Sequence, residues 1–200
     1  LLQGPYDLTH EIAPDPAKGV EDITPLPLLA NGERVTPTAF AKDDGSTAEA
    51  KVVTDKVLDV AYTGATDTSF GGAFLSYDLG GDESFDFTAK YPDGMVLSVE
   101  SPDSSAASIL LEFTDSSGEK DSVRLIDLKT FGQRFLVTGD KFFGVDLTKL
   151  QTLTVLFTGK VTQKVRLLQG PYDITHEIAS DPTKGVEDIT PLPLLANGER

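Results

Sequence analysis

Between residues 35 and 165, large apolar residues alternate with polar ones in a series of short runs. Alternation with a period of two predicts β-strands that have one buried face and one polar face. Five runs show it most clearly, at residues 73–79, 85–91, 95–100, 108–114 and 153–157. No stretch shows the longer period of an extended amphipathic helix. The pattern therefore predicts an all-β domain of antiparallel strands.

Turn-forming residues separate these runs. Asp93-Gly94 follows one run, and residues 115–118 form the polar tip of a hairpin that we expect over residues 112–125. Residues 146–150 indicate a single helical turn with Asp146 as its N-cap. Many short strands with regular turns are typical of an antiparallel β-sandwich of the jelly-roll type.

The chain begins and ends with almost the same 34 residues. Residues 1–34 and 167–200 differ at three positions, which are Leu8/Ile174, Pro14/Ser180 and Ala17/Thr183. An engineered copy of a linker would be identical, so we interpret the chain as one 166-residue period of a natural tandem repeat and the start of the next. We expect both ends to be cuts in a longer polypeptide. The expected units are a connector at 1–34, a jelly-roll domain at 35–166 and a second connector at 167–200.

Prolines concentrate in the duplicated segment. Five of the 12 prolines lie in residues 1–34 and four in 167–200. Because proline fixes φ and cannot donate to a β-ladder, we expect an extended connector. Its apolar residues are too many for a freely flexible linker. We expect it to dock on a neighbouring repeat, with an edge strand around residues 27–30, through the side chains of Ile23, Leu26, Leu28 and Leu29.

The order of four segments resembles that of the galactose-binding-like jelly rolls found in carbohydrate-binding modules. These segments are GAFLSYDL, FDFTAKYPDG, ASILLEFTDSSGEKDSVRL and FFGVDLTKLQTLTVLFTG, within about residues 40–160. The resemblance implies a jelly-roll scaffold that binds glycans through aromatic platforms on a concave sheet face or at loop tips, often with a structural calcium ion. The chain departs from the family in having no Trp, and core packing accounts for most of its 11 Phe and five Tyr residues.

The polar face of the predicted sheet supplies candidate groups for hydrogen bonding to sugar hydroxyls. If the strands align as in the related modules, a groove would gather Tyr77, Asp78, Asp86, Lys90, Glu100, Glu112 and Arg124. The alternative is an ordinary solvated face, on which opposite charges across strands contribute about 0.2–1 kcal/mol each.

Clusters of carboxylates are a second candidate site. Ca²⁺ takes oxygen ligands, which Asp, Glu and backbone carbonyls supply. The candidate ligands are Glu21 and Asp22 in the connector, Asp43 and Asp44 before Gly45, and the pair Asp82-Glu83. None has the spacing of an EF-hand loop, and Asp-Gly is also a common turn dipeptide. A calcium site and ordinary turns both remain as interpretations.

Composition narrows the chemistry further. With no Cys, the chain has no disulfide, thiolate metal site or Cys nucleophile. Its two histidines occur in the same dipeptide, His10-Glu11 and His176-Glu177, and the further ligands that a zinc site needs are missing. There is no G-x-S-x-G elbow, and glycoside hydrolysis by paired carboxylates normally needs a deep cleft that a small domain seldom offers. We therefore expect a protein that is not an enzyme.

The chain is strongly acidic, with 32 acidic and 17 basic residues and a net charge of −15. This charge argues against nucleic acid as a partner, because a basic face is needed to bind phosphates. No apolar run approaches the ~20 residues that a membrane-spanning helix needs. Near-identical repeats of an acidic, Cys-free β domain are typical of extracellular or cell-surface proteins.

Two functional hypotheses follow. The first is a structural repeat unit of an extracellular fibre or adhesin, whose partners are neighbouring repeats of the same chain or other copies of it. The alternative is a multivalent carbohydrate-binding module of an adhesin or of a polysaccharide-degrading protein, with a polysaccharide as its partner. Exposure of Tyr62, Phe70, Tyr77 or Tyr91 on one flat surface would favour the alternative.

Overall fold

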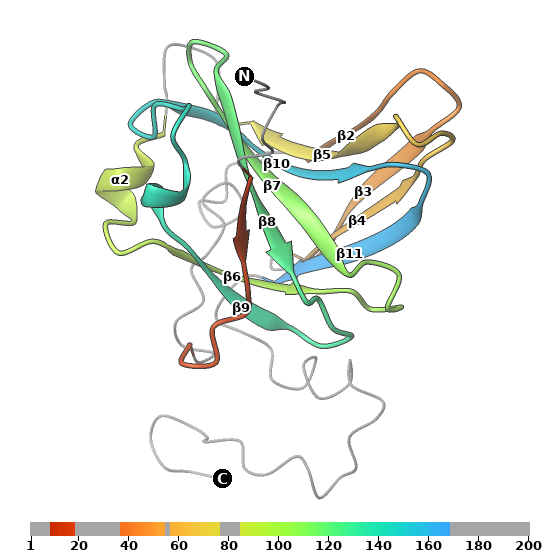
Figure 1. Cartoon of the computed structure of the whole chain (residues 1–200), viewed down its shortest axis with the longest axis horizontal. Helices are drawn as coiled ribbons and strands as arrows, with labels where there is room; N and C mark the ends of the chain where they lie inside the picture. The colour runs from red at the N-terminus through yellow and green to blue at the C-terminus, as the bar shows by residue number, and fades with distance from the viewer. Residues whose placement is uncertain (1–8, 19–36, 55–56, 77–84, 169–200) are drawn as a thin grey trace, which may run out of the picture.

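Two β-sheets packed face to face make up the computed structural model, which describes residues 9–18, 37–54, 57–76 and 85–168 (Figure 1). The six-stranded sheet has the order β1-β8-β7-β10-β5-β2. Its strands are β1 (His10–Ile12), β8 (Lys120–Ile126), β7 (Ser108–Asp115), β10 (Leu150–Thr158), β5 (Phe70–Ser76) and β2 (Thr38–Ala41). The pair β1–β8 is parallel, and the other described pairs in this sheet are antiparallel.

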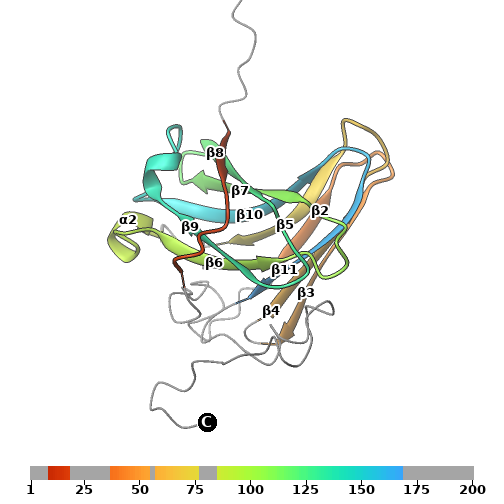
Figure 2. The same ribbon diagram turned by 60° about the horizontal axis from the view of Figure 1, so that its bottom comes forward.

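The second sheet has five strands in the order β3-β4-β11-β6-β9 and is antiparallel throughout its described pairs (Figure 2). Its strands are β3 (Thr47–Thr54), β4 (Val57–Thr63), β11 (Thr162–Leu168), β6 (Met95–Glu100) and β9 (Gln133–Val137). Along the chain the strands pass repeatedly from one sheet to the other, as in a jelly roll. The predicted all-β antiparallel sandwich is therefore confirmed.

The core lies between the sheets, where alternate side chains of each strand meet. In β7, for example, Ile109, Leu111 and Phe113 are buried and the residues between them are partly accessible. Large rings fill the middle, with Phe113 stacked on Phe142 at 4.6 Å between ring centroids and Tyr62 on Phe157 at 5.7 Å. The alternation read from the sequence thus corresponds to burial of the core face in strands such as β7, whereas β6 is buried on both faces.

Most of the predicted strands are present with small shifts of their ends. The run at 95–100 coincides with β6, and those at 108–114 and 153–157 fall within β7 and β10. The run at 73–79 overlaps β5 as far as Ser76, beyond which the described residues end. The hairpin at 112–125 is confirmed, because β7 and β8 pair antiparallel around the tip.

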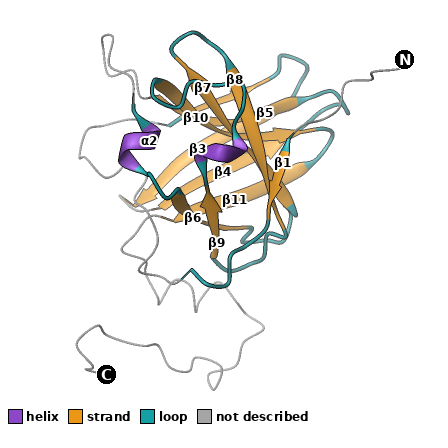
Figure 3. Ribbon diagram, turned by 60° about the vertical axis from the view of Figure 1, so that its left-hand side comes forward, coloured by secondary structure: helices purple, strands orange, loops and turns teal. Residues whose placement is uncertain are grey.

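The predicted strand at 85–91 is wrong. Phe85 makes an isolated bridge to Leu150, and the chain then forms a short helix, α2 (Phe87–Lys90) (Figure 3). The cause is local, because the Oδ1 atom of Asp86 accepts a hydrogen bond from the backbone N–H of Ala89 at 2.9 Å and caps the helix. Asp146 accepts a similar bond from Thr148, although the residues that follow form a turn rather than a helix.

The first and the last strand of the structure both contain residues of the duplicated segment. β1, at the outer edge of the six-stranded sheet, comes from residues 1–34, and Leu167 and Leu168 at the end of β11 are the first two residues of the second copy. Both leucines are buried. The edge strand predicted at 27–30 and the docking residues Ile23, Leu26, Leu28 and Leu29 lie outside the described residues.

Candidate functional site

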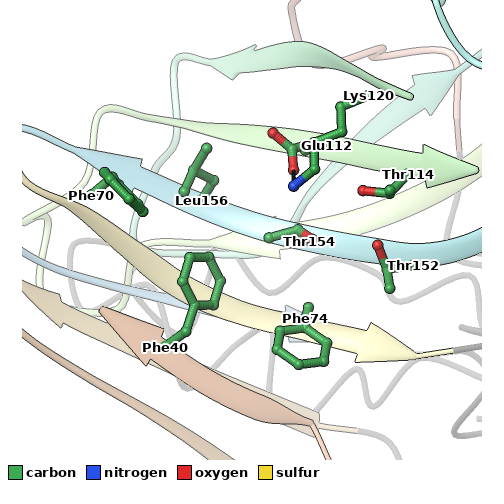
Figure 4. Close-up of a pocket in the computed structure, with 9 residues that line it drawn as sticks. All are labelled: Phe40, Phe70, Phe74, Glu112, Thr114, Lys120, Thr152, Thr154 and Leu156. Atoms are coloured by element: carbon green, nitrogen blue, oxygen red, sulfur yellow. Dashed lines mark hydrogen bonds and ion pairs between the residues drawn. The ribbon is translucent and has the colours of Figure 1, made fainter. Parts of the chain in front are cut away.

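An open groove runs across the outer face of the six-stranded sheet, the face turned away from the core. Strand register places its residues in rows across neighbouring strands. One row joins Phe74 of β5 to Thr154 of β10 and then to Glu112 of β7. The groove has a volume of about 410 Å³ (Figure 4). Nine residues line it: Phe40, Phe70, Phe74, Glu112, Thr114, Lys120, Thr152, Thr154 and Leu156.

One side of the groove is aromatic. Phe40 comes from β2, and Phe70 and Phe74 come from β5, with all three rings on the outer face (Figure 4). The Phe70 side chain is 44% exposed, and the Phe40 and Phe74 rings lie 6.1 Å apart at a 45° tilt. Gly72, opposite Phe40 in the ladder, has no side chain, and a Cβ there would clash with the carbonyl oxygen of Val155 at 1.9 Å. The groove therefore offers accessible ring surface rather than a sealed core.

The opposite side is polar. The Nζ of Lys120 lies 3.2 Å from Oε1 of Glu112, and the hydroxyl groups of Thr114, Thr152 and Thr154 belong to the same lining (Figure 4). Lys120 is more than half exposed, so this ion pair contributes little to stability. It nevertheless places one donor group and one acceptor group beside the rings with no net charge.

The structure distributes the predicted glycan residues over several places. Glu112 and Arg124 share the outer face of the six-stranded sheet, since Arg124 pairs with Leu110 of β7. Lys90 is the last residue of α2, next to the capping Asp86. Glu100 lies on β6 in the other sheet and is fully buried. Tyr77 and Asp78 are outside the described residues.

Glu100 belongs instead to a row of charges on the outer face of the five-stranded sheet. Arg166 of β11 pairs in register with Asp59 on one side and Glu100 on the other. Its Nε atom lies 2.6 Å from Oδ1 of Asp59, and its Nη1 atom lies 3.5 Å from Oε1 of Glu100. Lys164 adds a second contact to Asp59 at 3.2 Å. Burial would raise the pKa of Asp59, but hydrogen bonds and charge from Arg166 and Lys164 outweigh it and lower that pKa.

The four aromatic residues proposed as a test of glycan binding differ in exposure. Tyr62 is buried in the core, and burial raises the pKa of the half-buried Tyr91 to about 12. Tyr77 is outside the described residues, so of the four only Phe70 is seen to be exposed in the described part of the chain. Phe40 and Phe74, which complete the aromatic side, were not singled out from the sequence. The sequence did contain a sign of Phe74. Ala73, Phe74 and Leu75 are three consecutive apolar residues, so in a strand the side chain of Phe74 must lie on the opposite face from those of Ala73 and Leu75.

The calcium candidates are only partly described. Asp43 and Asp44 lie in the turn that precedes β3, while Glu21, Asp22 and the pair at 82–83 are outside the described residues. The carboxylate of Asp44 accepts hydrogen bonds from Ser46 and Ser69, which lower its pKa to about 2. Among the described residues, no three His, Asp or Glu side chains gather as a metal site would require. Calcium binding stays a prediction.

Comparison with solved structures finds carbohydrate-binding modules, the class that the four sequence segments resemble. The family 11 module of the cellulosomal cellulase Lic26A-Cel5E of Clostridium thermocellum matches with a TM-score of 0.48 and 14% identity, over 66% of this chain and 84% of that chain. A family 11 module from the same organism, in complex with a β-1,3-1,4-mixed-linked tetrasaccharide, matches with a TM-score of 0.47 and 16% identity, over 66% and 85%. An exo-β-agarase matches with a TM-score of 0.41 and 12% identity, over 70% and 24%.

The other two comparisons find nothing similar: no protein-family model matches the chain, and neither does any curated protein. No helix among the described residues has the length and apolar character needed to cross a membrane.

Proposed function

We propose that this chain is a carbohydrate-binding module and that the groove on the outer face of the six-stranded sheet holds a polysaccharide. The observation that carries the proposal is the aromatic side of that groove, formed by Phe40, Phe70 and Phe74 opposite the Glu112–Lys120 pair. Aromatic faces attract the polarised C–H groups of a sugar ring, and the charged pair and threonine hydroxyls can hydrogen-bond its hydroxyl groups. A glycan presents both kinds of surface at once.

A neutral polysaccharide fits this groove better than an acidic one. The glutamate and lysine of the groove balance one another, so no uncompensated cation there would attract a carboxylate or sulfate group. The chain as a whole carries a charge of −15, which repels polyanions at low salt. We therefore expect neutral glycans as ligands.

The same lining favours binding over hydrolysis. Glycoside hydrolysis needs two carboxyl groups on either side of the scissile bond. Among the nine residues that line the groove, Glu112 is the only carboxylate. We accordingly expect the glycan to be bound and released unchanged.

Affinity electrophoresis through gels containing soluble polysaccharides tests this function. The panel contains mixed-linked β-1,3-1,4-glucan, agarose and a neutral mannan, with alginate as the acidic comparison. We expect retardation by at least one neutral polymer. Phe70→Ala and Phe74→Ala should each weaken it about tenfold, equivalent to about 1.4 kcal/mol. Val53→Ala is the control, because Val53 is 45% exposed but lies outside the groove. Equal retardation of all three variants would refute binding in the groove.

A second role, as a structural repeat of an extracellular or cell-surface chain, is favoured by a different observation. The 34-residue duplication supplies β1 to the folded sandwich, so the repeated segment is at least partly docked. Serial modules would also raise avidity for a polymer without new contacts. If Ile23, Leu26, Leu28 and Leu29 dock as predicted, trypsin should cleave slowly after Arg34. Rapid cleavage there in the folded chain would contradict docking.

A further inference from the structure

The strand β1 is a short element attached to one edge of the sandwich. Its three residues pair in parallel with Val123, Arg124 and Leu125 of β8, at the outer end of the six-stranded sheet (Figure 3). A sheet edge of this kind accepts any chain that offers matching backbone groups and side chains. A small number of contacts therefore determines which segment pairs with the β8 edge.

Besides the ladder with β8, three contacts among the described residues hold the β1 segment in place. The side chain of Ile12 is 8% exposed and packs into the core. The ring of His10 lies 5.1 Å from that of Phe143, which is otherwise largely exposed. After the strand, the backbone N–H of Asp15 donates to the carbonyl oxygen of Arg134 in β9 at 2.8 Å. The docking surface thus consists of the β8 edge, the Phe143 ring and the Arg134 carbonyl.

The C-terminal copy of the segment carries every group that makes these contacts. His176, Ile178 and Asp181 correspond to His10, Ile12 and Asp15. The copies differ at positions 8, 14 and 17; position 8 lies outside the described residues, and the side chains of Pro14 and Ala17 are not part of the buried core. At position 17 the observed bond uses only the backbone N–H, which donates to Asp15 and which Thr183 also possesses. The two copies should therefore dock with nearly equal intrinsic free energy.

We propose that the β8 edge is an intermolecular docking site and that its occupant is residues 175–181 of a second copy of this chain. Exchange of one copy for the other replaces like contacts with like, as in domain swapping. The chain's own β1 has the advantage of a high effective concentration, and a second molecule competes with it by mass action. Docking of residues 175–181 of one molecule on the β8 edge of another links the two molecules. This inference is independent of glycan binding, because none of its contacts lies in the groove.

Disulfide trapping tests the proposal cleanly, since the chain contains no Cys. In β1, Glu11 pairs in register with Arg124, so Glu177 of a second copy should face Arg124 in the same way. The acceptor molecule carries three substitutions. Arg124→Cys supplies the cysteine for trapping, and Ile12→Asp and Ile178→Asp disable both of its own copies of the docking segment. The donor is Glu177→Cys. The matched control donors are Glu177→Cys with Ile178→Asp, and Glu199→Cys. Glu11→Cys with Arg124→Cys in one chain is the positive control.

In a glutathione buffer, we expect the mixed 124–177 disulfide between acceptor and donor to exceed that of either control donor by about tenfold or more. This factor reflects the apolar burial that Ile178→Asp removes. Equal yields from the three donors would overturn the proposal. Circular dichroism checks that the acceptor is folded. If it is not, Arg124→Cys alone serves as acceptor at high donor concentration, where a yield no greater than that of the controls would overturn the proposal equally.

Discussion

The two outer faces of the sandwich differ in what they leave accessible. On the six-stranded sheet, Phe70 is 44% exposed, and the Glu112–Lys120 pair lies in an open groove. On the five-stranded sheet, Asp59 is 9% exposed and Glu100 is not exposed at all. Apolar rings thus face solvent on one side, while charges are withdrawn from it on the other. Burial preferences alone would favour the reverse distribution.

The difference separates an outer face with a row of ion pairs from an outer face with an open groove. Arg166, on the central strand of its sheet, bonds to a carboxylate on each neighbouring strand and so fixes the register of β4, β11 and β6. In the described part of the chain, the aromatic side of the groove is held by the ring contact of Phe40 with Phe74 rather than by ion pairs, and Phe70 leaves ring surface exposed. One face holds a row of buried charges, and the other carries the groove in which we propose that a glycan binds.

The largest expected effect comes from breaking the charged row. Arg166→Met should lower the free energy of unfolding by about 3–5 kcal/mol, because it removes the Arg166 cation from the buried Glu100 and leaves Asp59 with the contact to Lys164. Urea denaturation followed by circular dichroism measures the loss. A loss below 1 kcal/mol would show that the row is effectively solvated, and the contrast between the two faces would disappear.

A smaller effect is expected in acid. The pKa of Asp59 is lowered in the folded state, so its stabilising contribution is complete above the unfolded pKa of about 3.9 and is lost as pH falls through the folded pKa. The free energy of unfolding should therefore fall below about pH 4. Asp59→Asn should be less stable at neutral pH and should lose part of this acid dependence. Asp93→Asn, at an exposed turn, is the control and should retain the wild-type profile.

The smallest effect is expected in the groove. Lys120→Met breaks an exposed ion pair and should change the free energy of unfolding by less than about 1 kcal/mol. Thermal denaturation beside Arg166→Met provides the direct comparison. Similar losses in the two variants would mean that the groove pair is as structural as the buried row.

The sequence by itself determined the fold class and much of the strand pattern. The strand β7 could be predicted because one phase of its alternation is strongly apolar, and burial of that phase is a local consequence of strand geometry. The repeat was equally legible, because identity at 31 of 34 positions needs no structure to be seen. The strand predicted at 85–91 failed because a single carboxylate, that of Asp86, caps a helix there.

Only the tertiary structure decided which outward side chains meet. Glu100 and Glu112 look alike in the sequence, yet one pairs with Arg166 in a buried row and the other with Lys120 in an open groove. Phe40 and Phe74 are more than thirty positions apart and become neighbours through the β2–β5 pairing. Likewise, the pattern of His10–Ile12 gives no sign of the β8 edge that it occupies. Such contacts depend on strand order and register between distant segments, which local alternation does not encode.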